Sequence, residues 1–485
     1  MSALSRADFL VSAAAPALRC ALPGASAPGW QRSYQAGCED RHGHLLGGSE
    51  MMHLVPHKGK LYAANGYWED SRNMWYGGSS PANGWAQVLR LDGADAVWES
   101  DLELGPRHLR TEILKSLTFA TDGDGRPLPE PVELLVAAGW NGIGTGGVDV
   151  FVRDDVKGSW QTTRVLSGVK GDDAATRAMT VHRDAVTGVD RAFMSIGIHG
   201  IFSGVYDAQS PGRIRWDRQP ESGPTQTRIL ALTEANGSLF FSEGMKIYRR
   251  VDGPAPRYLL VVDMSDVRDE GATRTQLSEI GGVRGLTAIA NPNGAGESLI
   301  FLWASGPRSQ GCIFRLDPDG SGGYVRKREQ CLAPLVSAYL GHVPVPYVLG
   351  NYNALFPVRD PVTQEVVSLI GLAAFVAQNP YSPAAKIPTA PNQRKTTGGF
   401  YAGGLYAIRD AKGRYRISEV AGPPSPSLPA LVSVRAFAMS PFPEDRGNVV
   451  YFAGYDGNDS PSSDTAWIFR ADTPTVLGKN PVLTR

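Results

Sequence analysis

The sequence predicts an all-β fold in which seven similar units, each of four strands, close into a ring. Three observations support this prediction. The 485 residues include 56 glycines and 35 prolines spread along the whole chain, as expected of many short strands joined by many turns. A strand that ends in Asp recurs seven times, and a β-rich segment that ends near Gly precedes each copy. Units of this size cannot bury both faces of a small sheet alone, so they must pack against one another.

The recurring Asp marks the end of one outer strand and the start of a turn. The seven copies end at Asp92, Asp154, Asp207, Asp252, Asp317, Asp410 and Asp472. In six copies an aromatic residue follows five to nine residues later, namely Trp98, Trp160, Trp216, Tyr258, Tyr324 and Tyr415. An Asp at a strand end accepts hydrogen bonds from turn amides, and the aromatic residue can pack over the hairpin. Each copy therefore predicts the two outer strands of one unit.

The β-rich segments before these hairpins supply the next strand inward. They span residues 60–66, 134–139, 192–197, 239–244, 300–306, 366–371 and 449–454. With one earlier strand in each unit, the pattern predicts a seven-bladed β-propeller of four-stranded blades. The order of strand, Gly, strand, Asp, turn and aromatic residue resembles kelch-type repeats over residues 48–475, although the second glycine of that motif is mostly missing. The resemblance implies the architecture alone, because such propellers include both enzymes and binding modules.

The last unit needs a strand from elsewhere in the chain to complete it. No outer strand follows Asp472, whereas residues 29–34 begin with Gly-Trp and have no hairpin of their own. We therefore predict that this N-terminal strand closes the last blade and that Trp30 supplies its aromatic residue.

The chain is expected to be one exported propeller domain. Residues 1–27 resemble an export signal of the twin-arginine type, with Ala7 where the second arginine belongs. Residues 28–485 form the propeller, with an insertion at 378–399 that is either a lid or a loose excursion. The longest apolar run, residues 366–377, is too short to span a bilayer. The predicted location is therefore extracytoplasmic, in the periplasm or secreted.

The four cysteines bear on the same question. Cys312 and Cys331 flank a hairpin turn and fall opposite each other, so we predict a disulfide between them. Cys20 and Cys38 would form the other local pair. The alternative is four buried thiols that act as small apolar side chains.

The charge balance limits the class of ligand. Forty-eight basic residues balance 48 acidic ones, and no block of like charges stands out. A nucleic-acid binder needs a basic surface that this composition does not supply. A small molecule or a saccharide is the expected partner.

The innermost strands place one polar residue per blade in register. These residues are Glu50, Glu112, Arg177, Arg228, Arg284, Asn353 and Arg435. Because inner strands line the channel of a propeller, four arginines there should bind an anion such as a carboxylate. The alternative is that the arginines tie neighbouring blades together and never meet a ligand. Two residues later each blade has a large apolar residue, expected deeper in the channel or between blades: Met52, Leu114, Met179, Leu230, Leu286, Leu355 and Phe437.

Rim loops and histidines complete the predicted site. Trp68, Trp140 and Asp456 lie in loops that would open on one face and could contact a sugar. His199, His182 and His53 are the candidate bases, with Glu50 and Glu112 as partners for hydrolysis. Three histidines in the channel could alternatively hold a divalent metal, although no cofactor is certain.

Taken as a whole, these features predict an exported propeller enzyme, a lyase or hydrolase. Its substrate would be an anionic small molecule or a uronate-containing saccharide in the central funnel, because arginines beside a histidine base would stabilise an enolate during β-elimination. The alternative function is a propeller that binds a ligand or glycan without chemistry.

Overall fold

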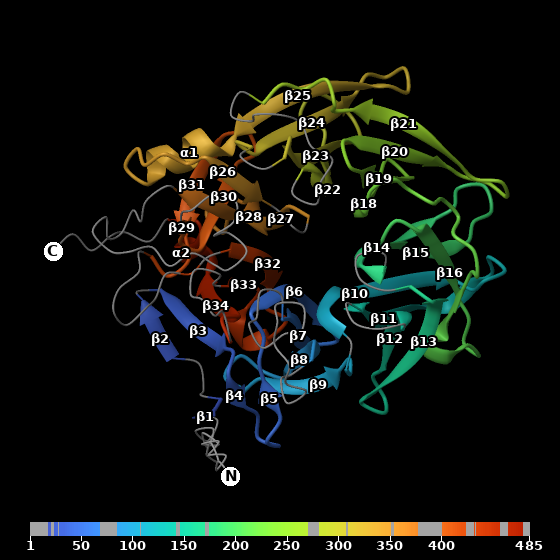
Figure 1. Ribbon diagram of the computed structural model, residues 1–485, viewed down its shortest axis with the longest axis horizontal. Helices are drawn as coiled ribbons and strands as arrows, with labels where there is room; N and C mark the ends of the chain where they lie inside the picture. The colour runs from blue at the N-terminus through green and yellow to red at the C-terminus, as the bar shows by residue number, and fades with distance from the viewer. Residues whose placement is uncertain are drawn as a thin grey trace, which may run out of the picture.

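The computed structural model describes the protein over residues 18–20, 24–27, 29–67, 85–106, 108–141, 146–169, 174–269, 281–306, 309–350, 354–376, 400–422, 431, 433–455 and 464–478. It is an all-β structure with few helices. Figure 1 shows the sheets following one another around a propeller-like ring, from the blue N-terminal strands through green and yellow to the red C-terminal strands.

Five sheets of four or more strands make up this ring. The largest, with 13 strands, contains β2 (Gly24–Ala27), β3 (Trp30–Gln35), β6 (Glu50–His57), β7 (Lys60–Gly66), β8 (Gln87–Leu91), β9 (Glu99–Glu103), β10 (His108–Thr121), β11 (Pro127–Asn141), β12 (Gly147–Asp154), β13 (Ser159–Ser167), β32 (Ser433–Met439), β33 (Val449–Tyr455) and β34 (Trp467–Asp472).

Three sheets are antiparallel and four-stranded. They comprise β14 (Thr176–Arg183), β15 (Asp190–Ile196), β16 (Gly200–Tyr206) and β17 (Ile214–Trp216); β18 (Ile229–Ala235), β19 (Ser238–Glu243), β20 (Lys246–Val251) and β21 (Arg257–Asp263); and β22 (Gly282–Ala290), β23 (Glu297–Ala304), β24 (Cys312–Pro318) and β25 (Tyr324–Cys331). In each of them the strands pair in chain order.

The fifth sheet has six strands. They are β26 (Tyr347–Gly350), β27 (Phe356–Arg359), β28 (Val366–Val376), β29 (Phe400–Ala402), β30 (Leu405–Arg409) and β31 (Tyr415–Glu419). A small sheet outside the ring contains β1 (Leu18–Arg19), β4 (Cys38–Glu39) and β5 (Leu45–Leu46). The short helices are α1 (Leu332–Tyr339), α2 (Thr473–Val476) and the 3₁₀ turns η3 (Pro211–Arg213) and η4 (Pro443–Asp445).

The predicted count of seven blades is not confirmed, because strands from three predicted units belong to one 13-stranded sheet. Two of the links within that sheet are short. β10 meets β7 through the single pair Arg110 and Gly66, and β33 meets β6 through the single pair Tyr455 and Glu50. The propeller-like ring of antiparallel sheets is confirmed, and the number of its blades is not.

The apolar cores lie between neighbouring sheets, which explains why the second strands are apolar on both faces. One cluster joins Phe119 and Val136, from β10 and β11, to Met194 and Phe202, from β15 and β16. On β11 every residue from Leu134 to Asn141 is buried. A strand covered on both faces reads as a continuous apolar run rather than an alternating one.

The N-terminal strand β3 adds to the last unit beside β34, and β2 pairs with its other side. It pairs antiparallel with β34, with Trp30 opposite Ala471. Trp30 is buried and meets the ring of Phe452 edge-on at a centroid distance of 5.1 Å. This is the pairing that the predicted closure of the ring requires.

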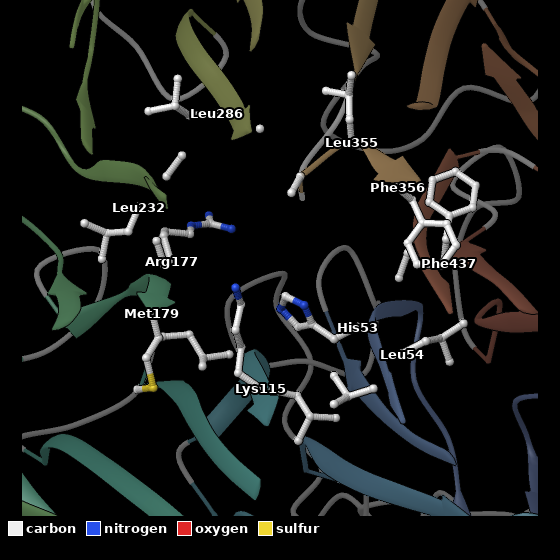
Figure 2. Close-up of a pocket in the computed structure, with 18 of the residues that line it drawn as sticks. His53, Leu54, Lys115, Arg177, Met179, Leu232, Leu286, Leu355, Phe356 and Phe437 are labelled. Carbon is white, nitrogen blue, oxygen red and sulfur yellow. The ribbon is translucent and has the colours of Figure 1, made fainter. Parts of the chain in front are cut away.

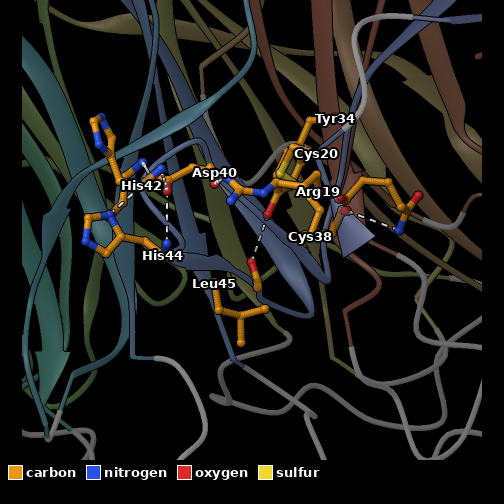
Figure 3. The surroundings of a disulfide bond; sticks show 12 residues. Arg19, Cys20, Tyr34, Cys38, Asp40, His42, His44 and Leu45 are labelled. Carbon is orange, nitrogen blue, oxygen red and sulfur yellow. Dashed lines mark hydrogen bonds and ion pairs between the residues drawn. A yellow bond between two sulfur atoms is a disulfide. The ribbon is translucent and has the colours of Figure 1, made fainter. Parts of the chain in front are cut away.

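Both local cysteine pairs are bonded. Cys312 is linked to Cys331 across β24 and β25, as predicted, and Cys20 is linked to Cys38. Figure 3 shows the Cys20–Cys38 disulfide beside Tyr34 and Arg19. The guanidinium of Arg19 donates a hydrogen bond of 3.0 Å to the Asp40 carbonyl. The predicted export signal, residues 1–27, contains Cys20 and β2, and cleavage after residue 27 would remove both. The export signal therefore stays a prediction. The helices of the described segments include none long and apolar enough to cross a bilayer.

Candidate binding cavity at the centre of the ring

The inner strands share a local irregularity that positions the site. In β6, β10, β14, β18, β22 and β32 the pairing register with the next strand shifts near the predicted ring of polar residues. For example, the shift lies between Thr111 and Ile113 in β10, and Glu112 falls within it. A β-bulge of this kind adds an unpaired residue and turns its side chain away from the regular alternation. The bulges therefore decide which side chains face the centre.

Four charged residues of the first three inner strands form one largely buried chain of ion pairs: Glu50 of β6, Arg110 and Glu112 of β10, and Arg177 of β14. Arg110 Nε lies 2.6 Å from Glu50 Oε1, and Arg110 Nη1 lies 3.2 Å from Glu112 Oε1. Glu112 Oε1 is in turn 3.1 Å from Arg177 Nη1. Glu50, Arg110 and Glu112 are 0%, 3% and 1% exposed. Charges withdrawn from water this far are retained only when they are paired, so this chain holds the inner strands together.

Arg110 was missed by the sequence analysis. It lies two residues before Glu112 on the same strand, and its guanidinium lies between the carboxylates of Glu50 and Glu112. A search for a cation beside the two predicted carboxylates would have found it.

The other predicted arginines do not line the central cavity. Arg284 and Arg435 are buried, and Arg228 is partly buried. Among the ring residues that the structure describes, Arg177 is the one that lines the cavity. Asn353, Trp68 and Asp456 lie outside the described residues. Whether these residues bind a substrate stays a prediction.

The cavity itself has a volume of about 360 Å³ and lies at the centre of the ring (Figure 2). Its lining comes from inner strands all around the ring, and of the predicted apolar set all except Met52 contribute. We call it the central cavity and define it by His53, Leu54, Val55, Pro56, Ile113, Leu114, Lys115, Ser116, Arg177, Ala178, Met179, Leu230, Ala231, Leu232, Gly285, Leu286, Ala354, Leu355, Phe356, Ala436 and Phe437.

Three basic side chains enter this apolar space. Figure 2 shows Lys115, Arg177 and His53 pointing into the central cavity between leucine and phenylalanine side chains. None of the described lining residues is acidic. The cavity is therefore apolar along its walls and positively charged at one place.

His53 stays neutral at ordinary pH. Its Nε2 donates a hydrogen bond of 2.7 Å to the carbonyl oxygen of Glu112. Burial, together with the nearby charges of Lys115, Arg110 and Arg177, lowers the pKa of His53 to about 4, although the hydrogen bond to the Glu112 carbonyl opposes this shift. A neutral imidazole whose Nε2 carries the proton has Nδ1 available as an acceptor.

Lys115 is a second residue that the sequence analysis missed. It follows Ile113 and Leu114 on β10, and its exposed side chain lines the central cavity and borders a second hollow. The loss of water around the charged form lowers the pKa of Lys115. No motif surrounds it, so its position in the fold is the signal that identifies it.

The remaining candidates lie elsewhere. His182 is buried, and its Nε2 lies 3.0 Å from Asp252 Oδ1 of the neighbouring sheet, so it joins two sheets. His199 lies in the turn between β15 and β16, away from the residues that line the central cavity. Trp140 is 1% exposed and packs with Leu109. Over the described segments, no group of three or more His, Cys, Asp or Glu side chains is arranged to hold a metal ion.

Comparisons with known proteins show distant structural likeness. No family model and no curated protein matches the chain, so the kelch-type resemblance is not confirmed. A Dyadobacter fermentans protein of unknown function is similar at 10% identity, with 92% of this chain and 100% of that chain covered and a TM-score of 0.41. A gluconolactonase from Xanthomonas campestris is similar at 11% identity, with 76% and 97% covered and a TM-score of 0.30. A Trypanosoma rangeli sialidase is similar at 11% identity, with 73% and 57% covered and a TM-score of 0.35.

Proposed function

We propose that the central cavity binds a small organic anion whose remaining part is apolar. The observation that carries this proposal is the combination of Lys115, Arg177 and His53 with leucine and phenylalanine walls and no acidic residue in the described lining. An anion placed beside Arg177 would gain charge-assisted hydrogen bonds from its guanidinium, each worth about 1.5 to 3 kcal/mol. The apolar walls would add about 25 cal/mol for each Å² of apolar ligand surface removed from water.

We further propose that the protein is an extracytoplasmic lyase or hydrolase that acts on such an anion, including a uronate-containing saccharide. The neutral imidazole of His53 in the central cavity supports a proton-transfer role. The second candidate is a binding protein without chemistry, and the apolar character of the walls supports it. Detection of product when sugar acids and organic phosphates are incubated with the protein separates the two. The two disulfides are consistent with an extracytoplasmic location.

We also propose that the ring contains seven blades. The 13-stranded sheet would divide at the single pairs Arg110–Gly66 and Tyr455–Glu50. Two of the parts would keep four strands each, β6–β9 and β10–β13, and the last part would contain β32, β33, β34, β3 and β2. Each single pair joins the inner strand of one unit to the second strand of its neighbour. An experimental structure would settle the count.

The binding proposal is tested by calorimetric titration with a panel of carboxylates and phosphates that carry sugar, aliphatic or aromatic groups. We expect at least one aliphatic or aromatic carboxylate to bind, and Arg177→Gln to weaken it by about 10- to 100-fold, equivalent to about 1.4 to 2.8 kcal/mol. The matched control is Arg126→Gln, because Arg126 is highly exposed and does not line the central cavity. Equal affinity of Arg177→Gln and the wild type would refute the proposed anion site.

A further inference from the structure

Lys115 is the lysine among the described residues that lines the central cavity, and its surroundings differ from those of three ion-paired lysines. Lys58, Lys60 and Lys157 each form an ion pair with an aspartate, with distances of 2.7, 2.5 and 3.5 Å. Within the described residues Lys115 forms neither an ion pair nor a hydrogen bond of its amine. Asp190 and Glu234 line a second hollow that Lys115 also borders, and neither forms an ion pair with it. Lys115 therefore has no carboxylate that would hold it in the charged form.

The neighbours of Lys115 in the central cavity also favour the neutral amine. The Lys115 side chain is solvent-accessible, and its amine shares the central cavity with apolar walls, the cation of Arg177 and the neutral ring of His53. A cation beside a lysine is an arrangement that activates its amine as a nucleophile. The lowered pKa of Lys115 agrees with this geometry.

We propose that Lys115 forms a Schiff base with the carbonyl carbon of a 2-oxo acid bound in the central cavity. The inference rests on the proposed function, because the carboxylate of the same molecule would occupy the anion site at Arg177. A 2-oxo acid places its carbonyl next to its carboxylate, so one small molecule presents both groups. Its side chain would lie against the apolar walls at Leu286 and Phe437.

The covalent step needs no oxidant or reductant. The Nζ lone pair of Lys115 attacks the carbonyl carbon, the C–O π pair moves to oxygen, and a proton transferred from nitrogen to that oxygen gives a carbinolamine. The hydroxyl then leaves with a further proton as water while the nitrogen lone pair forms the C=N bond. His53 is placed to move these protons, because its Nε2–H is committed to the Glu112 carbonyl and Nδ1 can accept.

The test is reductive trapping of the wild-type protein with 4-methyl-2-oxopentanoate and sodium borohydride, followed by peptide mass mapping. Borohydride reduces the imine to a stable secondary amine on the lysine. We expect at least tenfold more adduct on Lys115 than on Lys157, whose side chain is 70% exposed. The 2-hydroxy analogue, which has no carbonyl, should compete with the oxo acid and protect Lys115 without being trapped.

Two variants complete the design. Lys115→Arg lacks the nucleophilic amine, so it should lose the adduct. Calorimetry of this variant with the 2-hydroxy analogue shows separately what the substitution does to the anion site at Arg177. Lys157→Arg is the matched control and should be trapped like the wild type. Thermal melting of each variant shows that it is folded, and the wild-type measurement does not depend on either variant.

The outcomes separate the two proposals. If neither the oxo acid nor the hydroxy acid binds by calorimetry, and no other member of the carboxylate panel does, both the proposed function and the Schiff base are wrong. If the hydroxy acid binds and Lys115 carries no adduct, the anion site stands and the Schiff base is refuted. Adducts spread evenly over the exposed lysines, unchanged by the competitor, also refute it.

Discussion

The Tyr258 hydroxyl of β21 donates a hydrogen bond of 2.5 Å to Glu221, which follows β17 of the preceding sheet and donates its backbone amide to Ile201 of β16. Arg250 Nε binds the same carboxylate at 2.7 Å. The arrangement recurs twice: Trp160 and Arg153 bind Asp101, and Tyr415 and Arg409 bind Glu329. In each case an arginine of the third strand and the aromatic residue of the fourth strand bind a carboxylate of the preceding unit. The repeated aromatic residue therefore joins units to each other.

The first prediction concerns this contact. Glu221→Ala should lower the free energy of unfolding by about 2 to 4 kcal/mol, because it removes one carboxylate from a buried guanidinium. Arg250 has a side chain that is 1% exposed, and Asp184 and Asp252 would remain as its acidic partners. Tyr258→Phe should cost about 1 kcal/mol, since it removes one hydrogen bond. Urea unfolding measures both.

The matched control is an exposed ion pair. Arg326 and Asp266 lie 2.8 Å apart, and the Asp266 side chain is 66% exposed. Asp266→Ala should change stability by less than about 1 kcal/mol, because solvent screens such pairs. If Glu221→Ala were no more destabilising than this control, the contact would not be what joins the units.

The second prediction concerns stability at acidic pH. The pKa of His53 is lowered from its ordinary 6.5 to about 4, so between these values the unfolded chain binds a proton that the folded protein does not. The contribution of neutral His53 to the free energy of unfolding is fully present above about pH 6.5 and is lost as the pH falls toward 4. The loss should be about 2 kcal/mol, because water in the central cavity screens part of the effect. His53→Gln should remove that part of the slope in urea unfolding from pH 4 to 7. His42→Gln, at an exposed position, should leave the curve unchanged.

The strands were predictable because their signals are local. The predicted segment 60–66 coincides with β7, and the predicted segment 239–244 is shifted by one residue from β19. Apolar runs, turn residues and the recurring Asp all act within a few residues of the chain. The pair Cys312 and Cys331 was predictable for the same reason, since one hairpin places them opposite each other.

The site was predictable only in part, because it depends on contacts between units. The apolar residues predicted two positions after the polar residue of each inner strand include Leu286 and Phe437, and both line the central cavity. The two-residue spacing did not reveal that Arg110 would pair with Glu50, because Arg110 lies on the next inner strand. Lys115 carries no motif, and its role follows from apolar neighbours contributed by distant strands.

The third prediction concerns closure of the ring. Deletion of residues 29–35 should leave β34 without its outer partner and cause a large loss of stability together with aggregation, since an unpaired strand edge recruits other chains. Trp30→Ala is the milder test and should cost about 3 to 5 kcal/mol, because it empties a buried site beside Phe452. Arg32→Ala, on the exposed face of the same strand, should cost less than about 0.5 kcal/mol. Unchanged melting after the deletion would contradict the closure.

The last prediction separates a scaffold role from a ligand role in the buried chain of ion pairs. Arg110→Met leaves Glu50 and Glu112 in a buried position without the cation between them, and it should cost about 3 to 5 kcal/mol. Adding Glu50→Gln to Arg110→Met should recover part of that loss, because Glu112 keeps its contact with Arg177 at 3.1 Å. The double variant is then more stable than Arg110→Met alone, a non-additivity that urea unfolding of the single and double variants measures. Arg126→Met breaks the exposed pair with Asp124 and should change little. If the two buried substitutions simply added, Arg110 would not be the residue that neutralises Glu50, and the chain of ion pairs would not hold the inner strands together.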